Sequence, residues 1–387
     1  MIQELHLHLG MHKTGTTYLQ QVFEENSEQF LSQGIFYPKT KMKNGQHAFF
    51  LKEFMDVKVF NNHFWYIADN NLDLAAVLDL CKKNGIKKLF LSSEFFINPI
   101  ARKSILKLIE FISPKKIIFY LTLRNSNEWL ISAWHHYVTY VQTLTHRSIF
   151  MHLEKFPNYL NNRFLSEDAI PYYLNDWISK FNNSKLNIVK YDKNSLIDGF
   201  LQELNVKLLP INPNIRLNQS MNLCQLQIKY AINQIMIHEN TRSNEFHIFI
   251  NEVLENIKNQ QHTFMQTEKC RREVDEDTIK YFNELYYKFV SRLLQIPSVS
   301  MNSTTLEYLF EKQKIYTFKY PNSENKDLAY SLLIKCSENA IKLREKIWKD
   351  HEFLREKLES LDLKNQSLSP SRGHLLKRFF KYKKERN

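Results

Sequence analysis

The stretch GMHKTGTT, residues 10–17, stands between two segments of different periodicity. Residues 5–9 alternate between apolar and polar side chains, as in a short strand, and residues 16–30 carry apolar side chains at helical spacing. Backbone N–H groups in such a loop, together with the positive end of the helix dipole, bind anions. The two glycines have P-loop spacing, but Thr16 stands where the P-loop lysine is expected, and the lysine here is Lys13. The stretch predicts an anion site at the start of the first helix.

Strands and helices alternate along the chain after this stretch. Further strands are predicted at residues 87–92, 116–123 and 186–191, and helices at 72–84, 101–112, 127–141 and 195–204. The run at 116–123 is nearly all apolar, which is typical of a buried parallel strand. This alternation predicts an α/β fold, a three-layer P-loop-like domain with a central parallel sheet. In such a sheet, ligands bind outside the carboxyl ends of the strands.

Three parts of the chain differ in composition. Residues 1–295 hold the strand and helix pattern and form the predicted catalytic domain, which becomes mostly helical after residue 221. Residues 296–363 are predicted to be a helical extension, with a helix of mixed charge over 330–363. Residues 364–387 form a basic tail, either an amphipathic helix or disordered.

The charge of the chain is unevenly distributed. The net charge is +12, and the tail contributes +7 of it through eight Lys/Arg against one Glu. The remainder is only mildly basic, which argues against a general nucleic-acid-binding protein. The four cysteines are widely spread, which indicates a reducing compartment. The N-terminus lacks the pattern of a signal peptide, and no apolar run is long enough to span a membrane, so a cytoplasmic location is expected.

A second motif follows the apolar strand. In the stretch YLTLRNSNEWLIS, residues 120–132, Arg124 comes directly after the strand and Ser132 lies eight positions further on. A guanidinium group at a strand end suits a phosphate. Residues 9–20 and 120–132 together resemble the 5′-phosphosulfate loop and the 3′-phosphate motif of sulfotransferases that use 3′-phosphoadenosine 5′-phosphosulfate. The resemblance covers roughly residues 1–295.

The resemblance implies roles for particular residues. The donor would be held by Lys13, Thr14, Gly15, Thr16 and Thr17 in the loop and by Arg124 and Ser132 at the 3′-phosphate. Lys13 would also neutralise the bridging oxygen as the nucleotide phosphate leaves.

Residues 214–220 resemble the Asn-x-Ser stretch before the donor-covering loop of glycan sulfotransferases. The Lys-Gly-Arg run that follows it in the family is absent here, and Arg216 could take its place.

Two residues compete for the role of the general base. His47 lies in the connection after the first helix, where glycan sulfotransferases place a catalytic Glu or His, and Glu94 follows the second strand. His47 is favoured because a neutral imidazole titrates near working pH. His12, beside Lys13, is predicted to shape the loop rather than to react. No metal is expected, because the histidines show no convincing ligand spacing.

The function implied is sulfuryl transfer from that donor to a hydroxyl, or an amine, of a glycan or other small acceptor. The loops at 36–66 and 140–175 are expected to form the acceptor pocket. The alternatives are a kinase or nucleotide triphosphatase that uses the same loop, and a non-catalytic nucleotide-binding protein at a membrane. The tail suits peripheral contact with an anionic membrane, such as the inner face of a bacterial cytoplasmic membrane. The sequence leaves the acceptor and the oligomeric state open.

Overall fold

The computed structural model describes residues 2–40, 46–57, 59–60, 73–139, 152–192, 196–207, 223, 226–227, 230 and 271–318. The chain divides into two compact units, Met1–Gln227 with Gln266–Tyr320, and Ile228–Met265 with Pro321–Asn387. Tyr230 alone represents the second unit among the described residues. The predictions for Arg216, for the helix at 330–363 and for the basic tail therefore lie outside them.

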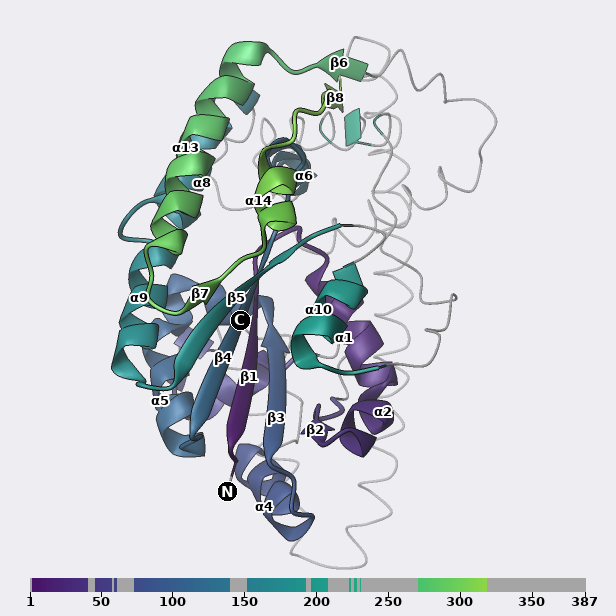
Figure 1. The fold of residues 1–387 in the computed structure, drawn as a ribbon. Helices are drawn as coiled ribbons and strands as arrows, with labels where there is room; N and C mark the ends of the chain where they lie inside the picture. The colour runs from purple at the N-terminus through teal and green to yellow at the C-terminus, as the bar shows by residue number, and fades with distance from the viewer. Residues whose placement is uncertain are drawn as a thin grey trace, which may run out of the picture. The chain divides into compact units, whose positions relative to one another are not determined.

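A six-stranded parallel sheet forms the centre of the first unit (Figure 1). Its strand order is β2-β3-β1-β4-β5-β7, with bounds β1 Glu4–Gly10, β2 Ile35–Phe36, β3 Lys88–Ser93, β4 Lys116–Leu123, β5 Ser184–Lys190 and β7 Val299–Ser300. All neighbouring strands are parallel, and β1 pairs with both β3 and β4. The predicted parallel α/β sheet is thus confirmed, and its four longest strands are those that the sequence predicts. A separate antiparallel pair joins β6 Arg271–Glu273 to β8 Tyr316–Phe318.

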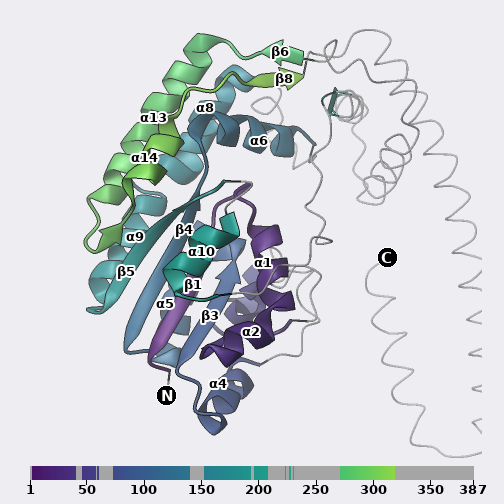
Figure 2. The same ribbon diagram turned by 45° about the vertical axis from the view of Figure 1, so that its right-hand side comes forward.

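Helices cover both faces of this sheet (Figures 1 and 2). The α-helices are α1 Thr16–Glu25, α2 Ser27–Ser32, α4 Leu74–Lys83, α5 Arg102–Ile112, α6 Ser126–Thr139, α8 Phe156–Leu160, α9 Ile170–Lys180, α10 Leu196–Leu204, α13 Glu276–Leu294 and α14 Ser303–Phe310. Shorter helical turns are η1 Ala48–Glu53, η3 Glu94–Ile97, η4 Pro99–Ala101, η6 Leu153–Lys155 and the π-helical turn η7 Asn161–Leu165. Helices α1, α2 and α10 lie on one face, and α5 and α9 on the other (Figure 2). The single helix predicted at 16–30 is two helices, because the chain leaves helical geometry at Asn26.

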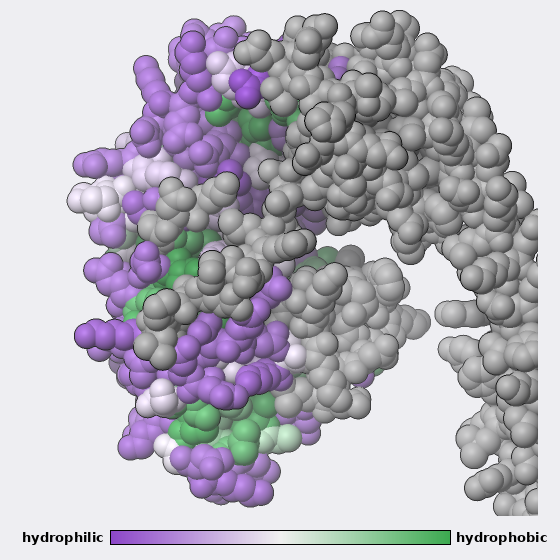
Figure 3. Space-filling view, turned by 90° about the vertical axis from the view of Figure 1, so that its right-hand side faces the viewer, coloured by the Kyte–Doolittle hydropathy of each residue, from purple (hydrophilic) through white to green (hydrophobic). Residues whose placement is uncertain are grey.

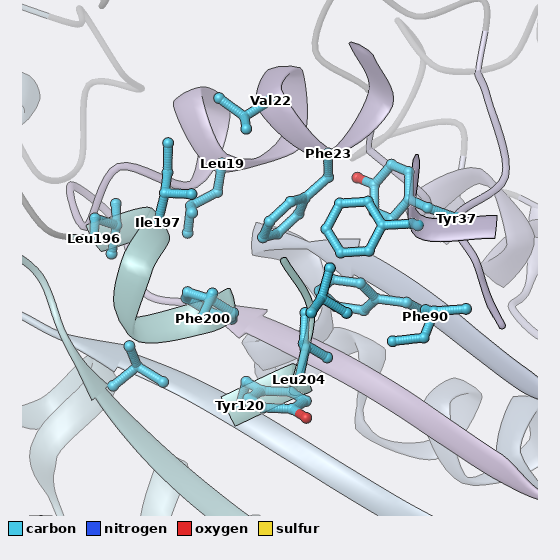
Figure 4. Packing of buried hydrophobic residues seen from close by; sticks show 14 of the residues in the cluster. Leu19, Val22, Phe23, Tyr37, Phe90, Tyr120, Leu196, Ile197, Phe200 and Leu204 are labelled. Carbon is cyan, nitrogen blue, oxygen red and sulfur yellow. The ribbon is translucent and has the colours of Figure 1, made fainter. Parts of the chain in front are cut away.

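Large aromatic and aliphatic side chains fill the space between the sheet and α1, α2 and α10 (Figure 4). Phe23 of α1 packs against Phe90 of β3 at a ring separation of 5.0 Å and against Phe200 of α10 at 5.7 Å. On β4, Tyr120 belongs to this core, while its neighbour Phe119 stacks on Trp177 of α9 on the opposite face. Burial on both faces explains why the β4 sequence is nearly all apolar rather than alternating.

The first unit extends beyond the predicted domain boundary at residue 295. Strand β7 pairs with β5 and therefore belongs to the central sheet. Helix α14 follows it, and the side chain of Asn125, at the end of β4, donates to the carbonyl oxygens of Tyr308 and Glu311 at 2.9 and 3.0 Å. Residues 296–318 thus complete the sheet domain instead of starting a separate extension.

The described surface is largely polar. On the face drawn in Figure 3, hydrophilic residues predominate, and hydrophobic ones are visible in separate patches. The most exposed large hydrophobic side chains, Val57 and Tyr287, come from different elements. Within the described ranges, no helix has the length and apolar character needed to cross a membrane.

Candidate functional site

The loop between β1 and α1 lies at the carboxyl end of the central strand. Strand β1 has β3 on one side and β4 on the other, so the chain crosses over in opposite directions from this point. In open α/β sheets, ligands bind in the crevice at such a switch point. The loop that the sequence predicts as an anion site is therefore at the position where this topology provides one.

The conformation of the loop leaves the backbone donors at the start of α1 without a side-chain cap. Lys13 and Gly15 both have positive φ angles, 65° and 74°. A side chain at Gly15 would be strained, and its Cβ would lie 2.5 Å from the Tyr191 ring. Gly15 is the N-cap of α1, with no side-chain cap and no acidic residue in the first turn. The first N–H groups of α1, at Thr16 and Thr17, thus have neither a capping side chain nor a carboxylate in that turn to satisfy them.

Two side chains from the second motif hold this loop. The Nε1 atom of Trp129 donates to the carbonyl oxygen of His12 at 2.7 Å, and Nη1 of Arg124 donates to the carbonyl oxygen of Lys13 at 3.2 Å. Within the loop, the Thr14 hydroxyl donates to the carbonyl oxygen of Met11 at 2.6 Å. The Thr14 side chain therefore shapes the loop. The structure brings together the two motifs that the sequence pairs only by resemblance.

Arg124 is held on two sides by residues that the sequence did not single out. Its Nε atom donates to Glu128 Oε2 at 3.0 Å, and its guanidinium group lies 4.8 Å from the centre of the Tyr191 ring. Glu128 lies four residues further along, at the start of α6, which is a spacing that could have indicated the pair. Ser132 is half-buried in the second turn of α6. Its proposed phosphate contact stays a prediction.

Lys13 is a half-buried residue of this loop. Burial lowers its pKa, the nearby Glu94 carboxylate raises it, and Arg124 lowers it further. Lys13 forms no ion pair with any side chain in the described part of the chain. Lys13 is therefore a cation that no described side chain pairs with, and it lies beside the uncapped N–H groups at the start of α1.

Glu94, the first residue of η3, joins the end of β3 to the loop. One carboxylate oxygen contacts Nδ1 of His12, and the other accepts from the Thr16 hydroxyl at 3.1 Å. Burial alone would raise the pKa of Glu94, but His12, Thr16 and Lys13 outweigh it and bring the pKa down to about 2. Glu94 is therefore a stable carboxylate rather than a carboxyl group tuned for proton exchange.

The structure does not support His47 as the base. Its side chain is completely buried, with Nε2 bonded to the carbonyl oxygen of Pro38 at 2.9 Å and Nδ1 accepting from the Ser92 backbone N–H at 3.0 Å. Burial lowers its pKa to about 4 despite these bonds. Because both ring nitrogens are engaged by the backbone, His47 fixes the connection after α2 against β3.

The sequence did not indicate the role of a buried polar side chain beneath the loop, that of His8. His8 of β1 bonds to Ser92 of β3 at 2.8 Å and to Thr122 of β4 at 3.1 Å, and Gln20 of α1 donates to the same Ser92 hydroxyl at 3.2 Å. The histidine therefore ties three adjacent strands together where the loop begins. Its alternating position in β1 had indicated only a strand.

A pocket of about 690 Å³ borders Arg124 on the side of α14. Two tyrosine rings, Tyr191 and Tyr308, belong to its wall. The full lining is Arg124, Glu128, Lys190, Tyr191, Asp192, Thr304, Glu307, Tyr308, Glu311 and Gln313. Its volume is in the range of small-molecule sites.

The described residues contain no group of three or more His, Cys, Asp or Glu side chains placed to hold a metal ion.

No protein-family model and no curated protein matches this chain. Among solved structures, it is similar to a chain from "Molecular and structural characterization of the PezAT chromosomal toxin-antitoxin system of the human pathogen Streptococcus pneumoniae". The TM-score is 0.22 and the identity 10%, over 67% of this chain and 87% of that chain. A likeness this small bears on neither the fold nor the function.

Proposed function

We propose that this protein is a sulfotransferase that moves a sulfuryl group from 3′-phosphoadenosine 5′-phosphosulfate to a hydroxyl or amine of a glycan or another small acceptor. The observation that carries the proposal is the hydrogen bond from Arg124 to the carbonyl oxygen of Lys13, between residues 111 positions apart. It unites two cationic motifs at one switch point of the sheet. A donor with phosphate groups at both the 3′ and 5′ positions requires two such centres.

The described residues fit this donor. The open N–H groups of the loop and the first turn of α1 suit the 5′-phosphosulfate, and Arg124 suits the 3′-phosphate. The pocket beside Arg124 has room for a nucleoside, and its carboxylates can accept hydrogen bonds from ribose hydroxyl and adenine amino groups.

Lys13 has the role of stabilising the leaving phosphate. Transfer develops negative charge on the oxygen that bridges sulfur and phosphorus. A preorganised cation in a partly desolvated site stabilises such charge more strongly than water does. Lys13 meets this requirement because the residue is half-buried and forms no ion pair in the described part of the chain. The donor supplies the sulfuryl group, and the protein supplies position and charge.

Calorimetric titration of 3′,5′-adenosine bisphosphate without magnesium tests the proposal. Wild type should bind it, and Arg124→Ala should lose about 2 kcal/mol, or roughly 30-fold in Kd. Lys13→Ala should weaken binding as well, through the loss of a cation beside the 5′-phosphate. Arg102→Ala is a matched control, because Arg102 also pairs with a carboxylate, Asp176 at 2.9 Å, and stacks on a tyrosine, Tyr172 at 4.7 Å, away from the loop.

The control variant should bind the bisphosphate like wild type. A folded wild type that binds ATP with magnesium and no bisphosphate would overturn the proposal in favour of a nucleotide triphosphate enzyme. Equal losses in Arg124→Ala and Arg102→Ala would show that the effect is on the fold and not on the site.

A further inference from the structure

An imidazole and a carboxylate form a close pair inside the loop. Nδ1 of His12 contacts Oε1 of Glu94, and the second oxygen of Glu94 accepts from the Thr16 hydroxyl. Both oxygens of the carboxylate are therefore committed to residues of the loop and of α1. The partners come from the ends of two adjacent strands, β1 and β3, whose registers fix their separation.

Both the backbone and the ring of His12 have further contacts. The backbone carbonyl oxygen of His12 accepts from Trp129, and the imidazole and the Phe164 ring pack edge to face with their centres 5.5 Å apart. The side chain is nevertheless 25% exposed. In the described part of the chain, Nε2 has no hydrogen-bond partner, so one ring nitrogen is fixed and the other is available.

We infer that His12 is the general base of the transfer and that Glu94 is the residue that positions it. The inference rests on the proposed function and adds the proton acceptor to it. A carboxylate that accepts the Nδ1 proton leaves Nε2 as the basic nitrogen and stabilises the imidazolium that forms when it takes a proton. The arrangement differs from the two predictions in which His47 or Glu94 itself accepts the proton, and from the prediction that His12 shapes the loop rather than reacts.

The step balances in charge and atoms. Nε2 of His12 takes the proton of the acceptor hydroxyl as the oxygen of that hydroxyl forms a bond to the sulfur. The bond between sulfur and the bridging phosphate oxygen breaks, and the electron pair stays on that oxygen beside Lys13. The products are the sulfated acceptor, 3′,5′-adenosine bisphosphate and an imidazolium paired with Glu94, which then releases its proton to solvent.

Three charged groups lie around His12. Glu94 faces the ring from η3, Lys13 follows it in the loop, and Arg124 reaches the adjacent carbonyl oxygen from the end of β4. Phe164 of η7 contributes no charge.

Turnover of the donor with water as the acceptor gives a test that needs no identified acceptor. Release of sulfate from radiolabelled 3′-phosphoadenosine 5′-phosphosulfate should fall about 100-fold or more in His12→Gln. The Kd for 3′,5′-adenosine bisphosphate should stay within about threefold of wild type, because the amide keeps a polar side chain in the loop. His152→Gln is the matched control, since His152 pairs with Glu154 through the same nitrogen, Nδ1, at 3.2 Å but is exposed.

A pH profile separates a positioning role for Glu94 from a merely structural one. In Glu94→Gln, the acidic limb of the kcat profile should move to lower pH, because the imidazolium loses its carboxylate. Nitrogen NMR of histidine-labelled wild type gives a readout independent of turnover. His12 should be the Nδ1-protonated tautomer in the neutral form, and this preference should weaken in Glu94→Gln.

Each outcome assigns the failure to one proposal. Unchanged turnover in His12→Gln with binding retained overturns the role of His12 and leaves the sulfotransferase proposal standing. Parallel losses of turnover and binding in that variant show that His12 only shapes the loop. An Nε2-protonated His12 in wild type overturns the inference even if the variants do not fold. Failure of wild type to bind the bisphosphate overturns the proposed function and, with it, this inference.

Discussion

Trp129 and His12 are 117 residues apart in sequence, and the indole Nε1 of the first donates to the carbonyl oxygen of the second at 2.7 Å. The indole is buried and packs against Phe164 and Phe282. This packing fixes its position independently of the hydrogen bond to the loop. The start of α6 thereby fixes the backbone of the residue that precedes Lys13. The loop between β1 and α1 therefore depends for its shape on α6, a helix that follows another strand, β4.

Replacement of Trp129 by Phe should loosen this loop. The substitution keeps an aromatic ring and removes the bond to His12, so bisphosphate affinity should fall about fivefold, which corresponds to about 1 kcal/mol. Trp177→Phe is a control of the same chemistry, because the indole nitrogen of Trp177 is buried and has no hydrogen-bond partner among the described residues. Isothermal titration of both variants checks the prediction. A loss of affinity in Trp177→Phe equal to that in Trp129→Phe would mean that ring volume, and not the hydrogen bond, matters.

In the proposed donor complex, Glu128 would compete with a phosphate for Arg124. Its carboxylate accepts from Nε of the guanidinium group at 3.0 Å and borders the same pocket. Glu128→Gln should therefore bind 3′,5′-adenosine bisphosphate more tightly than wild type, by about threefold to tenfold, because a negative charge beside the phosphate is lost. The gain should shrink at high salt.

Glu307→Gln serves as the control for this experiment. Glu307 lines the same pocket and forms no ion pair with Arg124 in the described part of the chain. Glu307→Gln should change the affinity for the bisphosphate less than Glu128→Gln does. Weaker binding in Glu128→Gln would instead show that the carboxylate orients Arg124 for the phosphate.

The central strands and the loop could be predicted because their signals are local. Strand β4 is buried on both faces and reads as a continuous apolar run, and the loop lies between two segments of clear periodicity. Strands β2 and β7 have two residues each, which is too short for any periodicity to show. The domain boundary at residue 295 was misplaced for this reason, since β7 lies just beyond it.

The interactions within the site could not be predicted from local signals. His12 and Glu94 meet because β1 and β3 are neighbours in register, and nothing in the 81 positions between them indicates that contact. His47 looked like a loop histidine, but its partners are backbone atoms of Pro38 and Ser92, which a sequence does not reveal. Arg124, by contrast, could be placed because it directly follows a recognisable strand.

The stability of the protein should fall as the pH drops below about 6.5. Burial lowers the pKa of His8 from 6.5 to about 3 and that of His47 to about 4. The unfolded chain therefore takes up protons on these histidines at a higher pH than the folded chain, and unfolding becomes easier as the pH falls. Between pH 6.5 and about pH 5, each of these two histidines should lower the free energy of unfolding by about 1 to 2 kcal/mol.

Urea unfolding at several pH values above about 5 measures this effect apart from the carboxylates, whose ordinary pKa values are lower. His8→Gln removes one buried imidazole, so its unfolding free energy should depend less steeply on pH than that of wild type, even if the variant is less stable at pH 7. Replacement of the exposed His152 by Gln should leave the slope unchanged. A slope that is the same in all three proteins would rule out His8 as a source of the pH dependence.

The basic tail, residues 364–387, offers a prediction that rests on sequence alone. Leu375, Leu376, Phe379 and Phe380 would form one stripe of a helix among cations, a pattern typical of helices that lie on anionic membranes. Each Lys or Arg near such a surface contributes about 1 kcal/mol. Deletion of the tail should therefore abolish cosedimentation with vesicles that contain anionic lipid and leave bisphosphate binding intact.

A charge-conserving variant separates the apolar stripe from the charge of the tail. Phe379→Ser with Phe380→Ser keeps every cation and removes two apolar anchors, so it should bind the same vesicles much more weakly than the wild-type chain. Unchanged binding in this variant would show that charge alone attracts the tail. Equal binding of the vesicles by the full chain and by the chain without residues 364–387 would show that the tail does not mediate membrane contact. Vesicles of neutral lipid should bind none of the three proteins strongly, because the electrostatic attraction is then absent.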